Sequence, residues 1–406
     1  MRSEKVMFDG TGGKLAARLD LPVGTPLMYA LFAHCFTCSK DVFAASRVSA
    51  ALTSLGIATL RFDFTGLGES DGEFENTNFT SNIADLLQAA EFLGEKYEAP
   101  KLLIGHSLGG AAVLAAAGDI PSAKAVATIG APFDPAHAGQ HFIDQHDQIK
   151  KDGVVKVDIG GRPFNVSRQF LEDIEDQAQA EKLHHLRKAL LIFHSPLDNI
   201  VGINNATNIF VAAKHPKSFI SLDKADHLLS RKEDAQYVAE VIASWARRYI
   251  PELSQNMPKT RLKPEAGETL VVGAPPAKFL QYVESNGHSL LADEPLSYGG
   301  TNRGPSPYDL LLSSLGACTS MTIRMYADRK KWPLENVAVK LQHKKIHAED
   351  CADCETTDGK IDVMTREIEL TGDLSDEQKS RLMEIADRCP VHKTLHSEVK
   401  IETSMA

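Results

Sequence analysis

Three residues in the N-terminal half have the types and the order that nucleophilic acyl transfer requires. Ser107 lies in Gly-His-Ser-Leu-Gly, between the apolar run KLLIG and the helix-prone run AAVLAAA. A G-x-S-x-G motif in this strand-turn-helix setting exposes the serine hydroxyl on a sharp turn, where side chains at the glycine positions would collide. Asp198 follows the run KALLIFH, and His227 follows KSFISL. The order predicts a triad in which Asp198 orients His227 as general base.

Two other acids could compete with Asp198. Asp226 adjoins His227, and Asp223 precedes that histidine too closely to match the order, so we interpret both as loop charges. The alternative is a chance match of the motif together with an ordinary surface histidine. Agreement between the motif, its setting and the chain order favours the triad.

Cysteines form the second group of residues with chemical potential. They are two C-x-x-C pairs, Cys35 with Cys38 and Cys351 with Cys354, and two distant residues, Cys318 and Cys389. The first residues contain no apolar signal region, so we expect a cytoplasmic protein, in which structural disulfides are uncommon. Redox or metal chemistry is therefore considered first, and the alternative for each cysteine is a small core residue.

One cysteine pair has histidines at a spacing that zinc sites use. His343, His347, Cys351 and Cys354 read H-x3-H-x3-C-x2-C and could supply four tetrahedral ligands. The first histidine lies in a strand-like run and the others in the loop that follows. We therefore favour surface histidines beside a redox-capable or unpaired C-x-x-C, and we predict no metal and no required cofactor.

Alternating short apolar runs and helix-like stretches must position the triad across residues 1–250. Within residues 80–97, apolar side chains recur at i, i+3, i+4 and i+7, which predicts a helix with one buried face. Strands that alternate with helices in this way predict an α/β domain with a mostly parallel sheet. Residues at about 134–186 break the alternation and are expected to form a small cap over the site.

A change in composition and periodicity separates this region from the rest of the chain. Residues 251–267 contain three prolines, scattered charges and almost no periodicity, which predicts a linker. In residues 268–406, strand-like runs are grouped apart from two helical regions, which predicts an α+β domain. Ser306 and Ser375 carry helix start signals, Pro390 is expected to end the second helix, and a last strand should follow.

The N-terminal motifs resemble those of the α/β-hydrolase superfamily. The serine motif and the segment RFDFTGLGESDG carry this resemblance, which covers residues 1–250. It implies an oxyanion hole with N–H donors from Leu108 and from Phe36, in the loop after the run MYALFA. That loop usually reads His-Gly, whereas Cys35 replaces the glycine here. Because Cys35 and Cys38 bracket Phe36, a disulfide between them would distort the loop, and we predict a redox switch there.

The C-terminal motifs are similar to those of the osmotically inducible protein C and organic hydroperoxide resistance (OsmC/Ohr) family. GGTNRGPSPYDLLLSSLGACTSM and DRCPVHKTL carry this second resemblance. It implies that Cys318 is the peroxidatic thiol and Cys389 the resolving thiol. The first would attack a hydroperoxide and become a sulfenic acid, and the second would close a disulfide that an external thiol reductant reopens. The resemblance also implies a homodimer formed through this domain.

This family places an arginine, held by a carboxylate, beside the reactive cysteine. Arg303 is the implied arginine, since positive charge favours the thiolate. The family's carboxylate position, ten residues before Cys318, is occupied by Tyr308. The neighbouring Asp309 is explained better as the third residue of a capping box that begins at Ser306.

Composition and net charge exclude some classes of function. A formal net charge of −10 leaves no global basic field for nucleic acid or an anionic membrane, and no membrane span is expected. We predict a bifunctional enzyme, a serine hydrolase of an ester or thioester fused to a thiol-dependent organic hydroperoxide reductase. The alternative is a non-catalytic redox sensor or dimerisation module fused to a ligand-binding or weakly active hydrolase fold.

Overall fold

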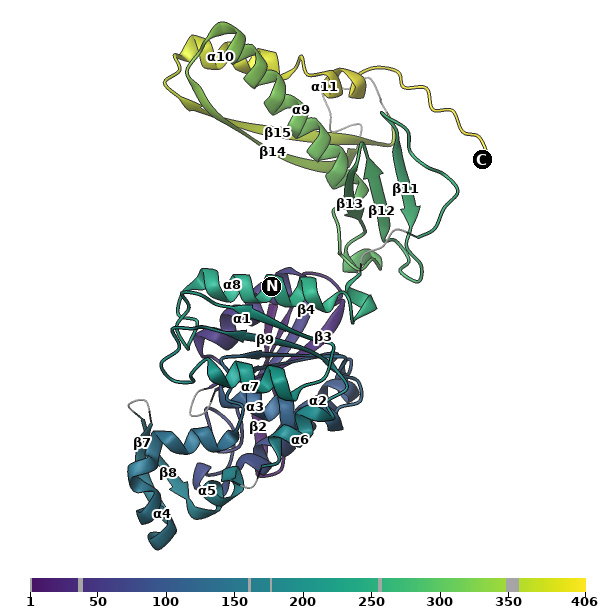
Figure 1. Ribbon diagram of the computed structural model, residues 1–406. Coiled ribbons are helices and arrows are strands. Elements are labelled where there is room, and N and C mark those ends of the chain that lie inside the picture. The colour runs from purple at the N-terminus through teal and green to yellow at the C-terminus, as the bar shows by residue number, and fades with distance from the viewer. Residues whose placement is uncertain (1, 36–38, 160–161, 176, 255–257, 348–357) are drawn as a thin grey trace. The chain divides into compact units, whose positions relative to one another are not determined.

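The structure divides into two compact units. The computed structural model (Figure 1) describes residues 2–35, 39–159, 162–175, 177–254, 258–347 and 358–406. Contacts within the chain separate Met1–Asn256 from Met257–Ala406, and this division falls inside the predicted linker. Each unit is described by itself. Among the described residues, no helix combines the length and the apolar character needed to cross a membrane.

An eight-stranded sheet forms the centre of the first unit, with the order β1-β2-β4-β3-β5-β6-β9-β10. Its strands are β1 (Arg2–Gly10), β2 (Gly13–Leu21), β3 (Met28–Ala33), β4 (Ile57–Phe62), β5 (Leu102–His106), β6 (Ala125–Ile129), β9 (Ala189–His194) and β10 (Lys217–Ser221). The six strands from β4 to β10 are parallel, and β1 and β2 pair antiparallel at one edge. The central strands read as continuous apolar runs because both of their faces are buried.

Helices cover both faces of this sheet (Figure 1). The helices α1 (Phe43–Ser54) and α8 (Lys232–Ala246) share a core with one face. On the other face lie α2 (Phe79–Lys96), α3 (Leu108–Ala116) and α7 (Asn204–Ala212). The predicted α/β architecture is confirmed. Helices on both faces leave the carboxyl ends of the parallel strands as the edge at which loops can assemble a site.

An insertion between β6 and β9 spans the region predicted as a cap. It contains η3 (Pro135–Gln145), α4 (His146–Asp152), β7 (Val154–Ile159), β8 (Arg162–Ser167), α5 (Arg168–Glu175) and α6 (Gln179–His184). Phe170, Leu171 and Ile174 of α5 are buried in the same apolar core as α2 and α3. The Asp173 carboxylate accepts hydrogen bonds from the backbone N–H and the hydroxyl of Thr80, at 2.8 and 2.6 Å. These contacts fasten α5 to the start of α2.

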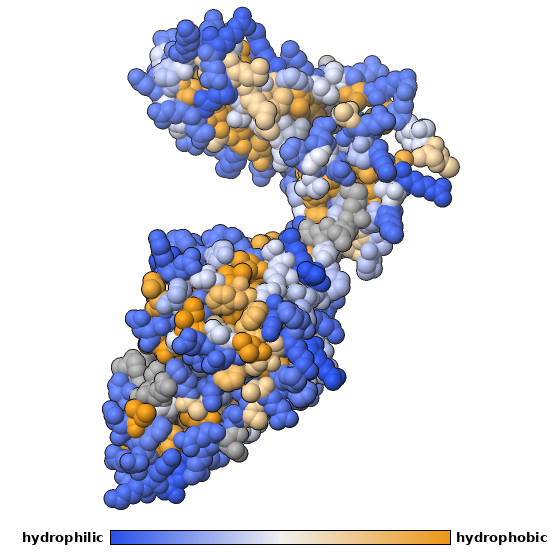
Figure 2. Space-filling model, in the orientation of Figure 1, coloured by the Kyte–Doolittle hydropathy of each residue, from blue (hydrophilic) through white to orange (hydrophobic). Residues whose placement is uncertain are grey.

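The second unit combines two antiparallel strand groups with helices, as predicted. One group is β11 (Thr269–Gly273), β12 (Gln281–Ser285) and β13 (His288–Ala292), and the other is the long hairpin β14 (Leu334–His347) and β15 (Lys360–Gly372). Its helices are α9 (Pro307–Lys330), α10 (Asp376–Ala386) and α11 (Pro390–Leu395). Apolar residues reach the surface of this unit (Figure 2), and they include Met321 and Met325 of α9.

Local start signals in this unit are confirmed, whereas two expectations about its end are wrong. Ser306 with Asp309, and Ser375 with Gln378, form reciprocal capping boxes at the starts of α9 and α10. The second helix already ends at Ala386, and Pro390 begins α11, because proline is tolerated at the first helical position. No strand forms in the described residues 396–406, since a strand needs a neighbouring backbone with which to pair.

Candidate active sites

Ser107 lies on a strained turn between β5 and α3. Its φ of 55° and ψ of −128° belong to a region that side-chain-bearing residues rarely adopt. A Cβ added at Gly105 would lie 2.3 Å from the carbonyl oxygen of Gly109, and one added at Gly109 would lie 2.2 Å from that of His34. Both glycines are therefore required by close backbone approach, which is the reason the sequence motif suggested.

Asp198 and His227 form a buried hydrogen-bonded pair. The distance between His227 Nδ1 and Asp198 Oδ2 is 2.7 Å, and the backbone N–H groups of Ile200 and Val201 donate to Asp198 Oδ1 at 2.9 Å. Burial opposes ionisation, yet these bonds and the charge of His227 hold the pKa of Asp198 below its ordinary value. A Cβ at Gly130 would come within 3.2–3.3 Å of both side chains, so this glycine closes tightly over the pair.

The sheet topology brings the predicted triad residues to one edge. Ser107 follows β5, Asp198 follows β9 and His227 follows β10, and all three strands run parallel. The rival acids are engaged elsewhere: Asp226 accepts from the Ser230 N–H at 2.9 Å, and Asp223 pairs with the Ser221 hydroxyl at 2.6 Å. The geometry supports the assignment of Asp198 as the orienting acid.

Two histidines beside this pair escaped the sequence analysis. His106 Nε2 lies 2.6 Å from the carbonyl oxygen of His227, so this nitrogen carries the proton and donates it. Burial and the nearby charge of His227 lower the pKa of His106 to about 3. His194 Nε2 likewise lies 2.7 Å from the Val201 carbonyl oxygen, and burial lowers its pKa. Both histidines are neutral and support the loops that carry the pair. In the sequence, only their positions near Ser107 and Asp198 could have indicated this role.

The loop predicted to complete the oxyanion hole is described only in part. Phe36 and Cys38 lie outside the described residues, while Cys35 is buried and disulfide-bonded. Leu108, the other predicted donor, is the first residue of α3 and is buried. Cys35 and Leu108 line a small cavity together with Phe64, Leu67 and other residues. The two oxyanion donors and the redox switch stay predictions.

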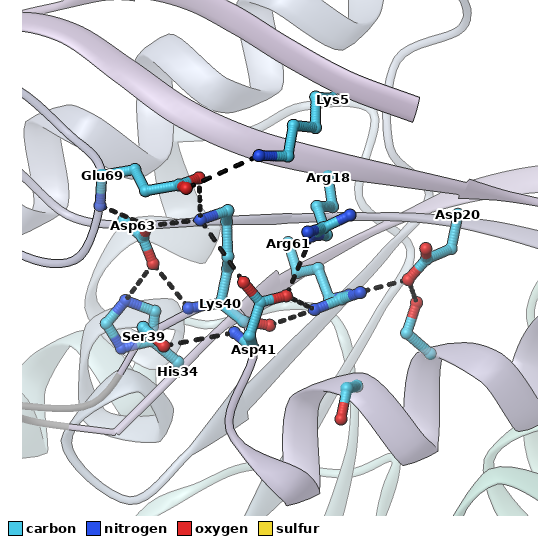
Figure 3. Close-up of polar contacts among 12 residues, drawn as sticks. Lys5, Arg18, Asp20, His34, Ser39, Lys40, Asp41, Arg61, Asp63 and Glu69 are labelled. Carbon is cyan, nitrogen blue, oxygen red and sulfur yellow. Dashed lines mark hydrogen bonds and ion pairs between the residues drawn. The ribbon is translucent and has the colours of Figure 1, made fainter. Parts of the chain in front are cut away.

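A buried ion pair anchors the far end of this loop (Figure 3). The backbone N–H of Lys40 donates to Asp63 Oδ1 at 2.5 Å, and its ammonium donates to Asp63 Oδ2 at 2.8 Å and to Glu69 Oε2 at 2.9 Å. Arg61 donates to the Lys40 carbonyl oxygen. Burial disfavours the ammonium, but its bonds to Asp63 and Glu69 outweigh that effect and raise the pKa of Lys40. A Cβ at Gly68 would lie 2.2 Å from Asp63 Oδ2.

These contacts explain the segment RFDFTGLGES, which the sequence showed only as a resemblance. Asp63 needs Gly68 beside it, and Glu69 completes the surroundings of the lysine. The segment therefore fixes the position of Lys40 between β3 and α1.

The second unit brings the segments of its two predicted cysteines together. Cys318, which is partly exposed, and Cys389, which is fully buried, are both free thiols. The Cys389 sulfur accepts from the backbone N–H of His392 at 3.2 Å and lies 3.7 Å from the hydroxyl oxygen of Thr319. Because Thr319 directly follows Cys318 in α9, the buried cysteine lies against the part of α9 that carries the other one.

Arg303 is held through its backbone. Its N–H donates to Asp293 Oδ2 at 3.2 Å, and the same carboxylate accepts from the N–H and the hydroxyl of Thr301. Asp293 is buried, which favours its neutral form, but these bonds lower its pKa below the ordinary value. The role of Arg303 at the thiols stays a prediction. Tyr308 stacks on His343, with ring centroids 4.3 Å apart.

The residues of the possible zinc site are only partly described. His343 Nε2 pairs with Asp362 Oδ1 at 2.7 Å, and His347 is the last residue of β14. Cys351 and Cys354 lie outside the described residues. Within the described part of the chain, no three His, Cys, Asp or Glu side chains are grouped so as to hold a metal ion.

Two protein-family models match successive parts of the chain. The model of the alpha/beta hydrolase family matches residues 30–298, and that of OsmC-like proteins matches residues 300–404. The first match runs past Asn256 over β11–β13, whereas the contacts group these strands with the second unit. The eight-stranded sheet and its covering helices are complete before Asn256, so the hydrolase fold ends at the contact boundary.

Individual relatives include hydrolases of acyl compounds. Palmitoyl-protein thioesterase ABHD10, mitochondrial, from Homo sapiens is 26% identical over 201 residues, which are 47% of this chain and 63% of that protein. The chain thus spans less than two thirds of the length of this relative. The solved esterase domain of a Rhodothermus marinus protein is 52% identical, with a TM-score of 0.51 over 62% of this chain and 100% of that one. Est1E from Butyrivibrio proteoclasticus with bound ferulic acid, 21% identical with a TM-score of 0.50 over 61% of this chain and 99% of that one, shares the fold.

Proposed function

We propose that the chain is a bifunctional enzyme. It belongs to the alpha/beta hydrolase family and also contains an OsmC-like domain. Its first unit is a serine hydrolase of esters or thioesters. Its second unit reduces organic hydroperoxides with a pair of thiols. The observation that carries the hydrolase proposal is the 2.7 Å pair of His227 and Asp198 at the sheet edge where Ser107 occupies its strained turn.

The hydrolase reaction follows from the roles of these three residues. His227 takes the proton of the Ser107 hydroxyl as its oxygen attacks the acyl carbonyl, and Asp198 stabilises the imidazolium that forms. The N–H of Leu108 at the start of α3 faces the developing oxyanion, with Phe36 as the second proposed donor. His227 then protonates the leaving alcohol or thiol, and water releases the acyl group from Ser107 by the same steps in reverse order.

A fluorophosphonate label tests this proposal, since such reagents modify activated serines. The intact protein should be labelled at Ser107, and Ser107→Ala should lose both the label and the hydrolysis of p-nitrophenyl acetate. Ser54→Ala, at an exposed serine of α1, is the control and should keep both. Equal labelling of all three proteins would contradict an activated Ser107.

For the second unit we propose the thiol cycle that the OsmC-like match suggests. Cys318 attacks the hydroperoxide and becomes a sulfenic acid while the alcohol leaves, and Cys389 condenses with it to give a disulfide and water. An external thiol reopens the disulfide. We further propose a homodimer through this unit, and the exposed Met321 and Met325 of α9 support it. A cytoplasmic location also stays a prediction, because the human relative carries the word mitochondrial in its name.

Single-turnover reaction with cumene hydroperoxide tests the thiol cycle. The prereduced protein should lose two thiols, and peptide mapping should locate a disulfide between Cys318 and Cys389. If both thiols survive, the alternative of a non-catalytic sensor or dimerisation module is favoured. The presence of Tyr308 at the family's carboxylate position is the observation that keeps this alternative open.

A further inference from the structure

A second arginine of the C-terminal unit, Arg366 on β15, joins three helices by one guanidinium group. Its Nη1 donates to the Thr319 hydroxyl oxygen at 3.0 Å and to the Ala386 carbonyl oxygen at 3.2 Å. Its Nη2 donates to Asp387 Oδ1 at 2.6 Å and faces His392 Nδ1 at 3.3 Å. These partners belong to α9, the end of α10 and α11. A planar guanidinium with several fixed donors suits such a junction, and a lysine would not.

The thiol of Cys389 lies within the same set of contacts. Its sulfur accepts from the backbone N–H of His392 and lies beside the Thr319 hydroxyl, so two of the residues that contact Arg366 also border this sulfur. Thr319 follows Cys318 in α9. Arg366 therefore ties the short helix that begins after Cys389 to the turn of α9 that carries Cys318.

The electrostatics of this junction are consistent with a positional role. Burial, and then the charge of Arg366, lower the pKa of His392 below its ordinary value. A neutral His392 can accept from Arg366 through Nδ1, which a protonated ring could not do. Asp387 balances the arginine charge, and because its side chain is 64% exposed, loss of Arg366 leaves no buried carboxylate without a partner. Loss of Arg366 should therefore disturb local geometry more than it disturbs folding.

We propose that Arg366 is a positioning residue for closure of the disulfide between Cys318 and Cys389. This inference rests on the proposed thiol cycle. In the step concerned, the Cys389 sulfur attacks the sulfur of the Cys318 sulfenic acid, an S–S bond forms and the S–O bond breaks. The departing hydroxide combines with the thiol proton of Cys389 to give water. The hydroperoxide has already supplied the oxidation, so no further oxidant is needed.

Formation of the Cys318–Cys389 disulfide should depend on Arg366 far more than the preceding attack on peroxide does. A disulfide requires Cα atoms about 4.4–6.8 Å apart and a restricted dihedral angle, so a small displacement of α11 hinders it. Attack on a hydroperoxide involves the Cys318 sulfur and does not involve Cys389, and the long helix α9 that carries Cys318 has further contacts, such as those of Arg324 with Leu334 and Glu335. The arginine thus affects one chemical step and leaves the other nearly unchanged.

The test compares the full-length protein with Arg366→Met in single-turnover reactions with cumene hydroperoxide, with dimedone present to trap sulfenic acid. We expect Cys318 to be oxidised at nearly the same rate in both proteins. Closure of the disulfide should slow about 10- to 100-fold in the variant, so that dimedone-labelled Cys318 accumulates. Arg366→Lys should fall between them. Equal closure rates in the two proteins would overturn the inference.

A control and an independent measurement keep the inference separate from the proposed function. Arg324 of α9 donates to the carbonyl oxygens of Leu334 and Glu335 and, among the described residues, makes no such contact beside Cys389. The variant Arg324→Met is therefore the control, and its Cys318–Cys389 disulfide should form at the normal rate. Equilibration with oxidised and reduced dithiothreitol needs no peroxide. There, Arg366→Met should hold a smaller fraction of the Cys318–Cys389 disulfide than the unaltered protein. Equal fractions would refute the positioning role, whereas failure of the unaltered protein to react with hydroperoxide would refute the thiol cycle alone.

Discussion

His106 should make the hydrolase unit less stable in acid. The residue is fully buried, and its pKa in the folded protein is about 3, against an ordinary value of 6.5. Between these two values the unfolded chain binds a proton that the folded protein does not bind. Stability therefore rises with pH across this window and is lost as pH falls from about 6.5 towards 3.

The magnitude follows from the same pKa difference. Each pH unit inside the window is worth about 1.4 kcal/mol, so acidification from pH 7 to pH 5 should cost about 2 kcal/mol through His106 alone. In His106→Gln, the side-chain amide can still donate to the His227 carbonyl oxygen, but it does not titrate. The variant should therefore lose about 2 kcal/mol less than the unaltered protein over this interval.

Urea unfolding at the two pH values measures this difference. The chain has two tryptophans, Trp245 in α8 and Trp332 in the second unit, so the full-length Trp332→Phe background makes Trp245 fluorescence specific for the hydrolase unit. His184→Gln, at an exposed histidine, is the control and should behave like the background. If His106→Gln loses as much stability as the background between pH 7 and pH 5, the reasoning about this buried histidine is wrong.

Three further predictions concern the same unit. Asp198→Asn should reduce the esterase rate by about 10⁴ with the fold intact, because the buried pair can no longer stabilise an imidazolium; a loss below tenfold, measured with p-nitrophenyl acetate, would speak against the triad. Lys40→Met should cost about 3–5 kcal/mol in urea unfolding because it leaves a buried carboxylate uncompensated, whereas Lys101→Met, at a half-buried lysine, should cost clearly less. Gly105→Ala should abolish soluble, active protein, while Gly118→Ala, where a Cβ meets no atom within 4 Å, should be active; similar activity would contradict the packing argument.

Periodicity and local motifs were sufficient for the architecture of the chain. The apolar runs around Ala30, Ala58 and Leu103 are parallel strands because sheets buried on both faces need continuous apolar sequence. The turn at Ser107 could be predicted because its glycines face backbone atoms of adjacent elements. Each of these signals is contained in a short continuous stretch of sequence.

Contacts between distant segments could not be predicted in this way. Arg366 lies in a strand with alternating polar and apolar residues, where an arginine normally indicates a solvent-facing position. Only its contacts with Thr319 of α9 and His392 of α11 reveal that its guanidinium lies between these helices. The same holds for His106, whose partner is a backbone carbonyl 121 residues away. The start of α11 at Pro390 was missed because proline signals both the end of one helix and the first turn of another.

The enclosed ammonium of Lys40 has a consequence for an enzyme that forms acyl intermediates. Lysine side chains capture activated acyl groups only when they lose their proton, and the bonds to Asp63 and Glu69 keep this one protonated. Lys40 can therefore hold the loop beside the proposed acylation site without becoming a target of the enzyme's own chemistry. Treatment of the folded protein with an acylating reagent should modify its exposed lysines and leave Lys40 intact.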